Sequence, residues 1–164
     1  MTGQTERTAG QRIQALQTVG FELRMMGHAS VLLRQAQLVD EDPMAQNAFF
    51  ESALLHARTL IAFFIQKRGR VSDIHRTDFA PDWAPAPADA VTRLDDHYPL
   101  LHKYLTHLTW ERVSKDAPIW NYPNIATDIV NVADAWASHL ELADRLMSDG
   151  FRPQVFLARQ ALDA

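Results

Sequence analysis

One short segment brings a carboxylate, an imidazole and a guanidinium close together in the sequence. Glu51 and Arg58 are seven residues apart, which places them on nearly the same face of a helix. His56 follows the apolar positions of that helix instead and is expected to point toward the core. Buried His and Arg side chains cost free energy unless they are paired.

This segment has two interpretations. In the structural one, His56 donates to a carbonyl, and Arg58 pairs with Glu51 or with an acid in a distant loop such as Asp78. In the functional one, His56 and Arg58 face a cleft as acid, base or anion-binding groups.

A second candidate cluster lies near the end of a predicted helix. His107 is at the edge of an apolar stripe, and Arg112 follows five residues later with the reach and charge to bind a phosphate or a carboxylate. The alternative is a network that holds the loop around Trp120. The candidate catalytic residues are therefore His56, Arg58, His107 and Arg112.

A basic run follows the apolar segment that ends near residue 67. It contains Lys67, Arg68, Arg70 and Arg76, with His75 among them. An anion-binding lip is one role for such a run. The sequence favours a basic cap, because the carboxyl end of a helix attracts cations and repels anions.

The chain has seven histidines, but their spacing does not favour a metal site. No two of them have the i, i+4 spacing that puts two imidazoles on one helix face. The di-iron pattern Glu-x-x-His is absent. We therefore expect no metal and no other cofactor, and a metal-dependent bundle enzyme is the third-ranked hypothesis.

Composition excludes several further classes. The chain has no cysteine, which rules out disulfides and Cys nucleophiles and suits a reducing, cytoplasmic location. Its formal net charge of -4 argues against DNA binding. No apolar run approaches the roughly 18 residues of a membrane helix. The sequence also lacks a P-loop, GxGxxG, GxSxG or zincin motif.

Apolar residues recur at helical spacing over residues 12–33, 43–67, 88–108, 124–147 and 154–162. Residues 68–88 contain three prolines and are predicted to form a long loop. The pattern predicts an all-α fold, an antiparallel up-down helical bundle of four to five helices with one long proline-containing loop. We expect one domain over residues 1–164, with 1–9 and 148–164 peripheral.

Two helices have further signals. The segment from Pro43 to Lys67 is apolar on most sides and is predicted to be the innermost helix. Gly20 and Gly27 lie inside the first helix, where each costs about 1 kcal/mol relative to Ala, so they predict a kink or a close helix contact.

Residues 47–64 read NAFFESALLHARTLIAFF, and this segment resembles the central signature of an uncharacterised prokaryotic all-α family. The dipeptide DF at 78–79, the stretch HKYLTHLT at 102–109 and Trp120 extend the resemblance over roughly residues 20 to 145. The resemblance implies an all-α fold and carries no assigned activity.

The segment from Arg70 to His75 matches the motif Arg-x4-6-His, and Arg68 also fits it with the same histidine. In this respect the chain resembles HEPN domains, small helical bundles of prokaryotic toxin and defence systems. The resemblance implies metal-independent RNA cleavage across a dimer interface, with an arginine on the phosphate and His75 or His107 as the acid–base group.

Each polar cluster has a structural explanation, so the first-ranked hypothesis is a non-catalytic interaction or regulatory protein. The predicted central helix carries more apolar surface than a small four-helix bundle needs, which favours a homodimer or another protein partner. RNA is an expected partner only under the HEPN-like alternative.

Overall fold

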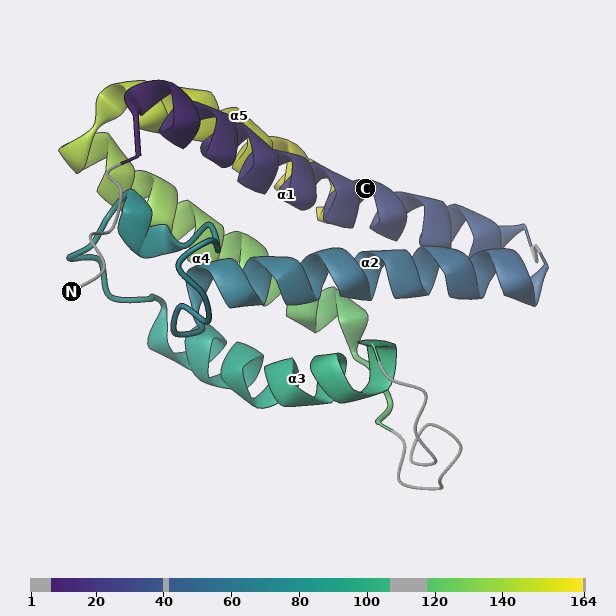
Figure 1. Cartoon of the computed structure of the whole chain (residues 1–164). Coiled ribbons are helices and arrows are strands. Elements are labelled where there is room, and N and C mark those ends of the chain that lie inside the picture. Colours follow the sequence, from purple (N-terminus) through teal and green to yellow (C-terminus); the bar gives the residue numbers. More distant parts are fainter. Residues whose placement is uncertain (1–6, 40–41, 107–117, 164) are drawn as a thin grey trace.

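The structure is a computed structural model that describes residues 7–39, 42–106 and 118–163 (Figure 1). In these ranges it has no strand and contains five α-helices and one short 3-10 helix. The elements are α1 (Ala9–Leu38), α2 (Pro43–Phe64), η1 (Arg76–Asp78), α3 (Ala88–Thr106), α4 (Tyr122–Ala143) and α5 (Arg145–Asp163). The predicted all-α bundle with one long proline-containing loop is confirmed.

Successive helices run in opposite directions, and the first and last helices are neighbours (Figure 1). α1 and α5 lie side by side and point the same way. Near their ends, Arg34 Nη1 of α1 donates to the carbonyl oxygen of Leu162 in α5 at 3.0 Å, and nearer their starts Gly20 faces Gln154. This parallel pair follows from the odd number of helices, because each connection reverses the chain direction.

The first two helices begin at side-chain caps. Thr8 and Gln11 form a capping box at the start of α1, in which each side chain accepts from the other residue's backbone N–H. Asp42 accepts from Met44 N at 3.1 Å, and Pro43 occupies the first turn of α2. The sequence signal at residues 42–43 therefore marks a real helix start.

An aromatic cluster occupies the centre of the core. The fully buried Trp136 of α4 is surrounded edge to face by four phenylalanine rings, with centroid distances of 5.0 to 5.8 Å. These rings come from α2, the long loop and α5 and are Phe63, Phe64, Phe79 and Phe151. The cluster thus joins α4 to three other parts of the chain.

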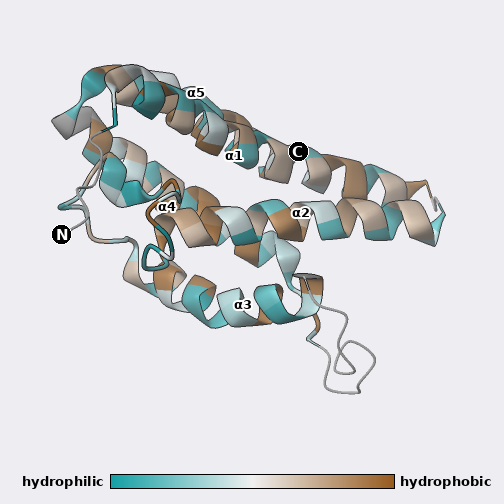
Figure 2. Ribbon diagram, viewed as in Figure 1, coloured by the Kyte–Doolittle hydropathy of each residue, from teal (hydrophilic) through white to brown (hydrophobic). Residues whose placement is uncertain are grey.

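The prediction that the segment from Pro43 to Lys67 is the innermost helix is wrong. α4 packs against all four other helices, whereas α2 has an open side on which Met44 and Leu55 are exposed. Figure 2 shows that α2 carries hydrophilic as well as hydrophobic residues along its length. An apolar composition on most sides indicated burial, but part of that apolar surface faces solvent.

The C-terminal segment also differs from the prediction. Only a short peripheral helix was expected after Gly150, yet α5 starts at Arg145 and continues through Gly150 and Pro153. Phe151 and Val155 are buried in the core. Tertiary burial of this face outweighs the helix-breaking signals, since Gly costs only about 1 kcal/mol in a helix interior.

Gly20 and Gly27 mark a close contact between α1 and α5. A Cβ atom on Gly27 would lie 3.1 Å from the Cβ of Ala161 and 3.4 Å from the Cα of Ala158. A Cβ on Gly20 would lie 2.8 Å from Gln154 Cγ. The prediction of a close helix contact at these glycines is confirmed.

Candidate functional site

His75 is the histidine most tightly held by its surroundings. It precedes η1 in the long loop and is only 4% exposed. Its Nε2 lies 2.7 Å from the carbonyl oxygen of Gln66, and its Nδ1 lies 2.8 Å from Thr77 Oγ1. Because carbonyl oxygens only accept, Nε2 donates and Nδ1 accepts in the neutral ring. Burial lowers the pKa of His75, which favours this neutral form.

Acidic and basic side chains complete the network around His75. Asp78 accepts from the backbone N–H of His75 at 2.9 Å and forms an ion pair with Arg68. Arg76 Nη1 donates to the Gln66 carbonyl oxygen at 3.1 Å. Gln66 follows the end of α2, so these cations lie where a basic cap on the helix dipole was expected.

Arg70 and His75, the two ends of the HEPN-like motif, both lie in the long loop. In this structure both ring nitrogens of His75 make hydrogen bonds within that loop. Arg70 is exposed, and its backbone N–H donates to Asp73 Oδ2 at 2.7 Å. The local contacts are those of a loop held in one conformation.

His56 has a different partner from the one expected. Its Nδ1 lies 2.8 Å from Glu22 Oε2 of α1, where the sequence suggested a carbonyl oxygen. Its ring also makes an edge-on contact with Phe21, with the centroids 6.4 Å apart. His56 therefore links α2 to α1 through contacts with Glu22 and Phe21.

Arg58 lacks both of the partners proposed from the sequence. Its Nε is buried and has no hydrogen-bond partner, and Arg58 forms no ion pair in the described residues. Asp78, one suggested partner, is held by Arg68 instead. The structure thus does not bring Arg58 and His56 together as an acid–base pair.

The other two candidate catalytic residues, His107 and Arg112, lie outside the described residues. Within those residues, no three His, Asp or Glu side chains gather as ligands for a metal ion. Nor does any helix there combine the length and the apolar character needed to cross a membrane.

A hydrophobic groove lies between α1 and α5. It has a volume of about 480 Å³, and we call it the α1–α5 groove. Phe21 is 46% exposed and Leu157 is 47% exposed, although both are large apolar side chains. The groove is lined by Phe21, Arg24, Met25, His28, Val31, Leu157 and Ala161.

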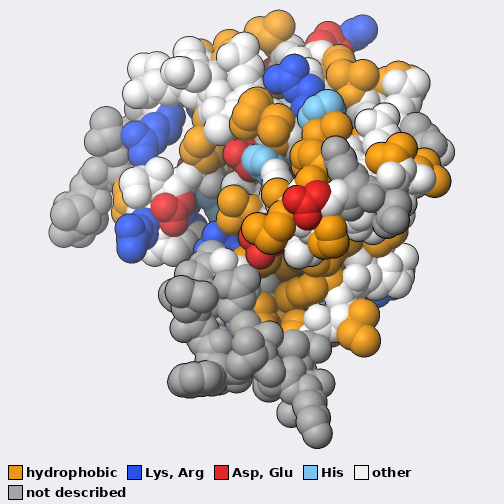
Figure 3. Space-filling model, turned by 90° about the vertical axis from the view of Figure 1, so that its right-hand side faces the viewer, with side chains coloured by type: hydrophobic (Ala, Val, Ile, Leu, Met, Phe, Trp, Pro, Cys, Tyr) orange, Lys and Arg blue, Asp and Glu red, His pale blue; other side chains and the backbone are white. Residues whose placement is uncertain are grey.

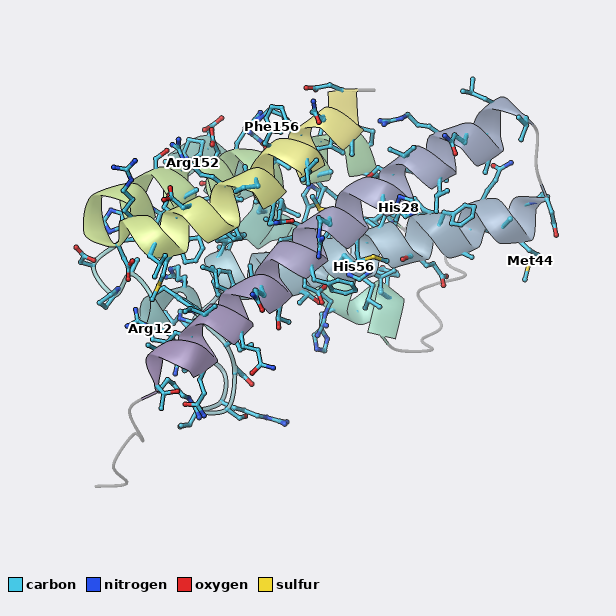
Figure 4. All side chains as sticks on the ribbon, turned by 90° about the horizontal axis from the view of Figure 1, so that it is seen from above. Arg12, His28, Met44, His56, Arg152 and Phe156 are labelled. Atoms are coloured by element: carbon cyan, nitrogen blue, oxygen red, sulfur yellow. The ribbon has the colours of Figure 1, made fainter. Side chains whose placement is uncertain are left out.

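Further exposed apolar side chains lie elsewhere on the molecule. Viewed from the end where α1 and α2 are joined, hydrophobic side chains spread over much of the molecule, with histidines among them (Figure 3). Phe156 is 61% exposed and points outward from α5 (Figure 4). Leu55, beside His56 on α2, is 48% exposed. Exposed apolar side chains that line one groove, as Phe21 and Leu157 do, are typical of interaction sites.

The sequence contained a signal for this groove that the predictions missed. Phe21, Met25 and His28 follow i, i+4, i+7 spacing, which forms a second stripe on α1 beside the core stripe of Leu16 and Leu23. One helix with two such stripes must bury one of them elsewhere or leave it in solvent.

Comparisons with known proteins add nothing to this description. No family model, no curated protein and no solved structure matches the chain.

Proposed function

We propose that this protein is a non-catalytic helical-bundle interaction protein that forms a homodimer through the α1–α5 groove. The observation that carries the proposal is the pair of half-exposed side chains, Phe21 and Leu157, on either side of one groove. Polar clusters elsewhere support it indirectly, because His75 and Asp78 are engaged in contacts within the loop.

A second copy of the same groove suits this surface. In a twofold dimer the same patch meets itself, so Phe21 and Leu157 of one protomer face the equivalent groove of the other. The two helices lie side by side and run in the same direction (Figure 4), and residues of both line the groove. Arg24 and His28 lie in the same groove and supply polar groups beside the apolar contact.

The expected affinity follows from the exposed apolar groups. Complete burial of a Phe or Leu side chain stabilises by about 1.5–3 kcal/mol, so the exposed halves of Phe21 and Leu157 in two copies contribute roughly 3–6 kcal/mol. Association costs at least about 4 kcal/mol, so Met25 and Val31 must add to the contact. Even a similar gain from Met25 and Val31 leaves a net of only a few kcal/mol, so we expect a weak dimer with a dissociation constant of roughly 100 μM.

Light scattering coupled to size exclusion, at protein concentrations from about 1 to 500 μM, tests this proposal. The wild-type chain should change from monomer to dimer, and Phe21→Glu should stay monomeric because a buried unpaired carboxylate is costly. Leu100→Glu is the matched control, since Leu100 is 37% exposed on α3, away from the groove. A wild-type chain that stays monomeric at 500 μM would remove the proposal.

A further inference from the structure

Arg12 is a partly buried arginine that has no carboxylate partner among the residues that the structure describes. Its guanidinium lies over the ring of Phe79, 5.9 Å from the centroid, and its Nη2 is 4.0 Å from the sulfur of Met147. Its Nε is buried and has no hydrogen-bond partner among the described residues. A thioether and an aromatic face are weak partners for a cation, so the desolvation of this guanidinium is poorly offset.

The same arginine lines a cavity of about 310 Å³ between the first turns of α1 and the long loop. The volume is at the lower end for small-molecule sites, which suits a ligand with few non-hydrogen atoms. The wall joins polar and apolar groups, among them Gln14, Thr18, Ser72, Ile74 and Phe79. Hydroxyl and amide groups next to an apolar surface can bind the polar and nonpolar parts of one small molecule.

The acids in this cavity do not neutralise Arg12. Asp78 is already engaged by Arg68 and by the backbone of His75. Asp73 accepts from the backbone N–H of Arg70 and is exposed to solvent. Arg7 adds a second cation to the lining. The guanidinium of Arg12 therefore has an unused donor, and no carboxylate within residues 7–39, 42–106 and 118–163 is paired with it.

We infer that this cavity binds a small organic anion whose carboxylate or phosphate group pairs with Arg12. A planar guanidinium donates two parallel hydrogen bonds to either group, which a lysine cannot do. Thr18 and Ser72 are placed to bind polar substituents of the same ligand. Arg12 lies near the start of α1, well separated from His28 and Phe156 (Figure 4), so this site is independent of the proposed dimer contact.

NMR titration of the full chain tests the inference with two probes, sodium phosphate and sodium acetate, at ionic strength held constant with sodium chloride. Saturable shifts of the amide signals of Gln14, Ser72 and Ile74 are expected with at least one probe. Saturation with phosphate alone identifies a phosphoryl ligand, and saturation with acetate alone identifies a carboxylate ligand. Arg12→Gln should weaken the binding at least about tenfold, because it removes the charge-assisted hydrogen bonds.

Arg70→Gln is the matched control. It removes one positive charge from the long loop that forms part of the cavity wall, at a residue that does not itself line the cavity. This variant should bind the probe as the wild type does. Arg12→Lys keeps the charge and should bind with an intermediate affinity, which provides a second variant if Arg12→Gln does not fold. Shifts that fail to saturate with both probes, or equal binding by the Arg12 variants and wild type, would overturn the inference.

Discussion

The long loop and the α1–α5 groove differ in how far their side chains are engaged by partners within the chain. In the loop, His75 and Asp78 are each held by several partners within the chain. In the groove, Phe21 and Leu157 leave about half of their surface in solvent. A shifted pKa often marks a functional site, but ion-pair and hydrogen-bond networks shift pKa values as well. Here the polar cluster stabilises the fold, and the better indicator of function is the unpaired apolar surface.

The largest expected effect tests whether the loop is part of the core. Phe79→Ala should lower the free energy of unfolding by about 3–5 kcal/mol, because it leaves a cavity next to Trp136. Urea unfolding followed by circular dichroism measures this change. A loss below about 1 kcal/mol would mean that the loop is only loosely attached, and the contrast with the groove would disappear.

A smaller effect is expected from the polar network of the loop. Asp78→Ala removes the ion pair with Arg68 and the acceptor of the His75 backbone N–H, at a cost of about 2 kcal/mol. Asp73→Ala is the control, since Asp73 is exposed and its side chain accepts one hydrogen bond within the described part of the chain, from the Arg70 amide. Equal urea midpoints for the two variants would show that the network does not hold the loop.

Titration of His75 should make the stability of the loop depend on pH. Burial lowers the pKa of His75 in the folded chain below the ordinary value of about 6.5, so the unfolded chain binds more protons between the two values. The stability contributed by neutral His75 is therefore present above pH 6.5 and is lost as the pH falls through this window.

The variant His75→Asn isolates this contribution. It should lower the stability by about 1 kcal/mol near pH 7.5, because the hydrogen bond to Gln66 is lost. The gap between wild type and variant in thermal melts should shrink near pH 5.5. A gap that stays constant or widens on acidification would contradict the neutral assignment of His75.

The smallest loss of stability per apolar side chain is expected in the groove itself. Replacing Phe21 and Leu157 together by Ser should lower the free energy of unfolding of the monomer by only about 1 kcal/mol per side chain, since about half of each is already exposed. Urea unfolding at about 1 μM, where the wild type is expected to be monomeric, measures this. A loss of more than about 3 kcal/mol would assign these residues to the fold.

Local signals predicted the helices well, and tertiary contacts explain where prediction failed. The start of α2 follows from Asp42 as a cap and Pro43 in the first turn, which are signals in adjacent residues. The close contacts at Gly20 and Gly27 follow from the missing side chain of glycine. The continuation of α5 through Gly150 depends on burial against other helices, which no local pattern encodes.

The same distinction applies to the candidate site. The partner of His56 is Glu22, 34 residues away on another helix, so spacing within α2 could not reveal it. The sequence also could not show that Arg58 Nε has no hydrogen-bond partner among the described residues, because the expected acid, Asp78, pairs with Arg68. The α1–α5 groove is lined by residues of both helices. Because residues 148–164 were predicted to be peripheral, no groove was expected there.

Site-specific cross-linking tests the central claim most directly, because the chain has no cysteine and each introduced thiol is therefore unique. Leu157→Cys in the groove and Leu100→Cys on α3 are treated with a short bis-maleimide near 100 μM and separated by denaturing electrophoresis. The account predicts a covalent dimer for Leu157→Cys and a monomer for Leu100→Cys. Equal cross-linking of the two variants, or none with either, would contradict self-association through the α1–α5 groove.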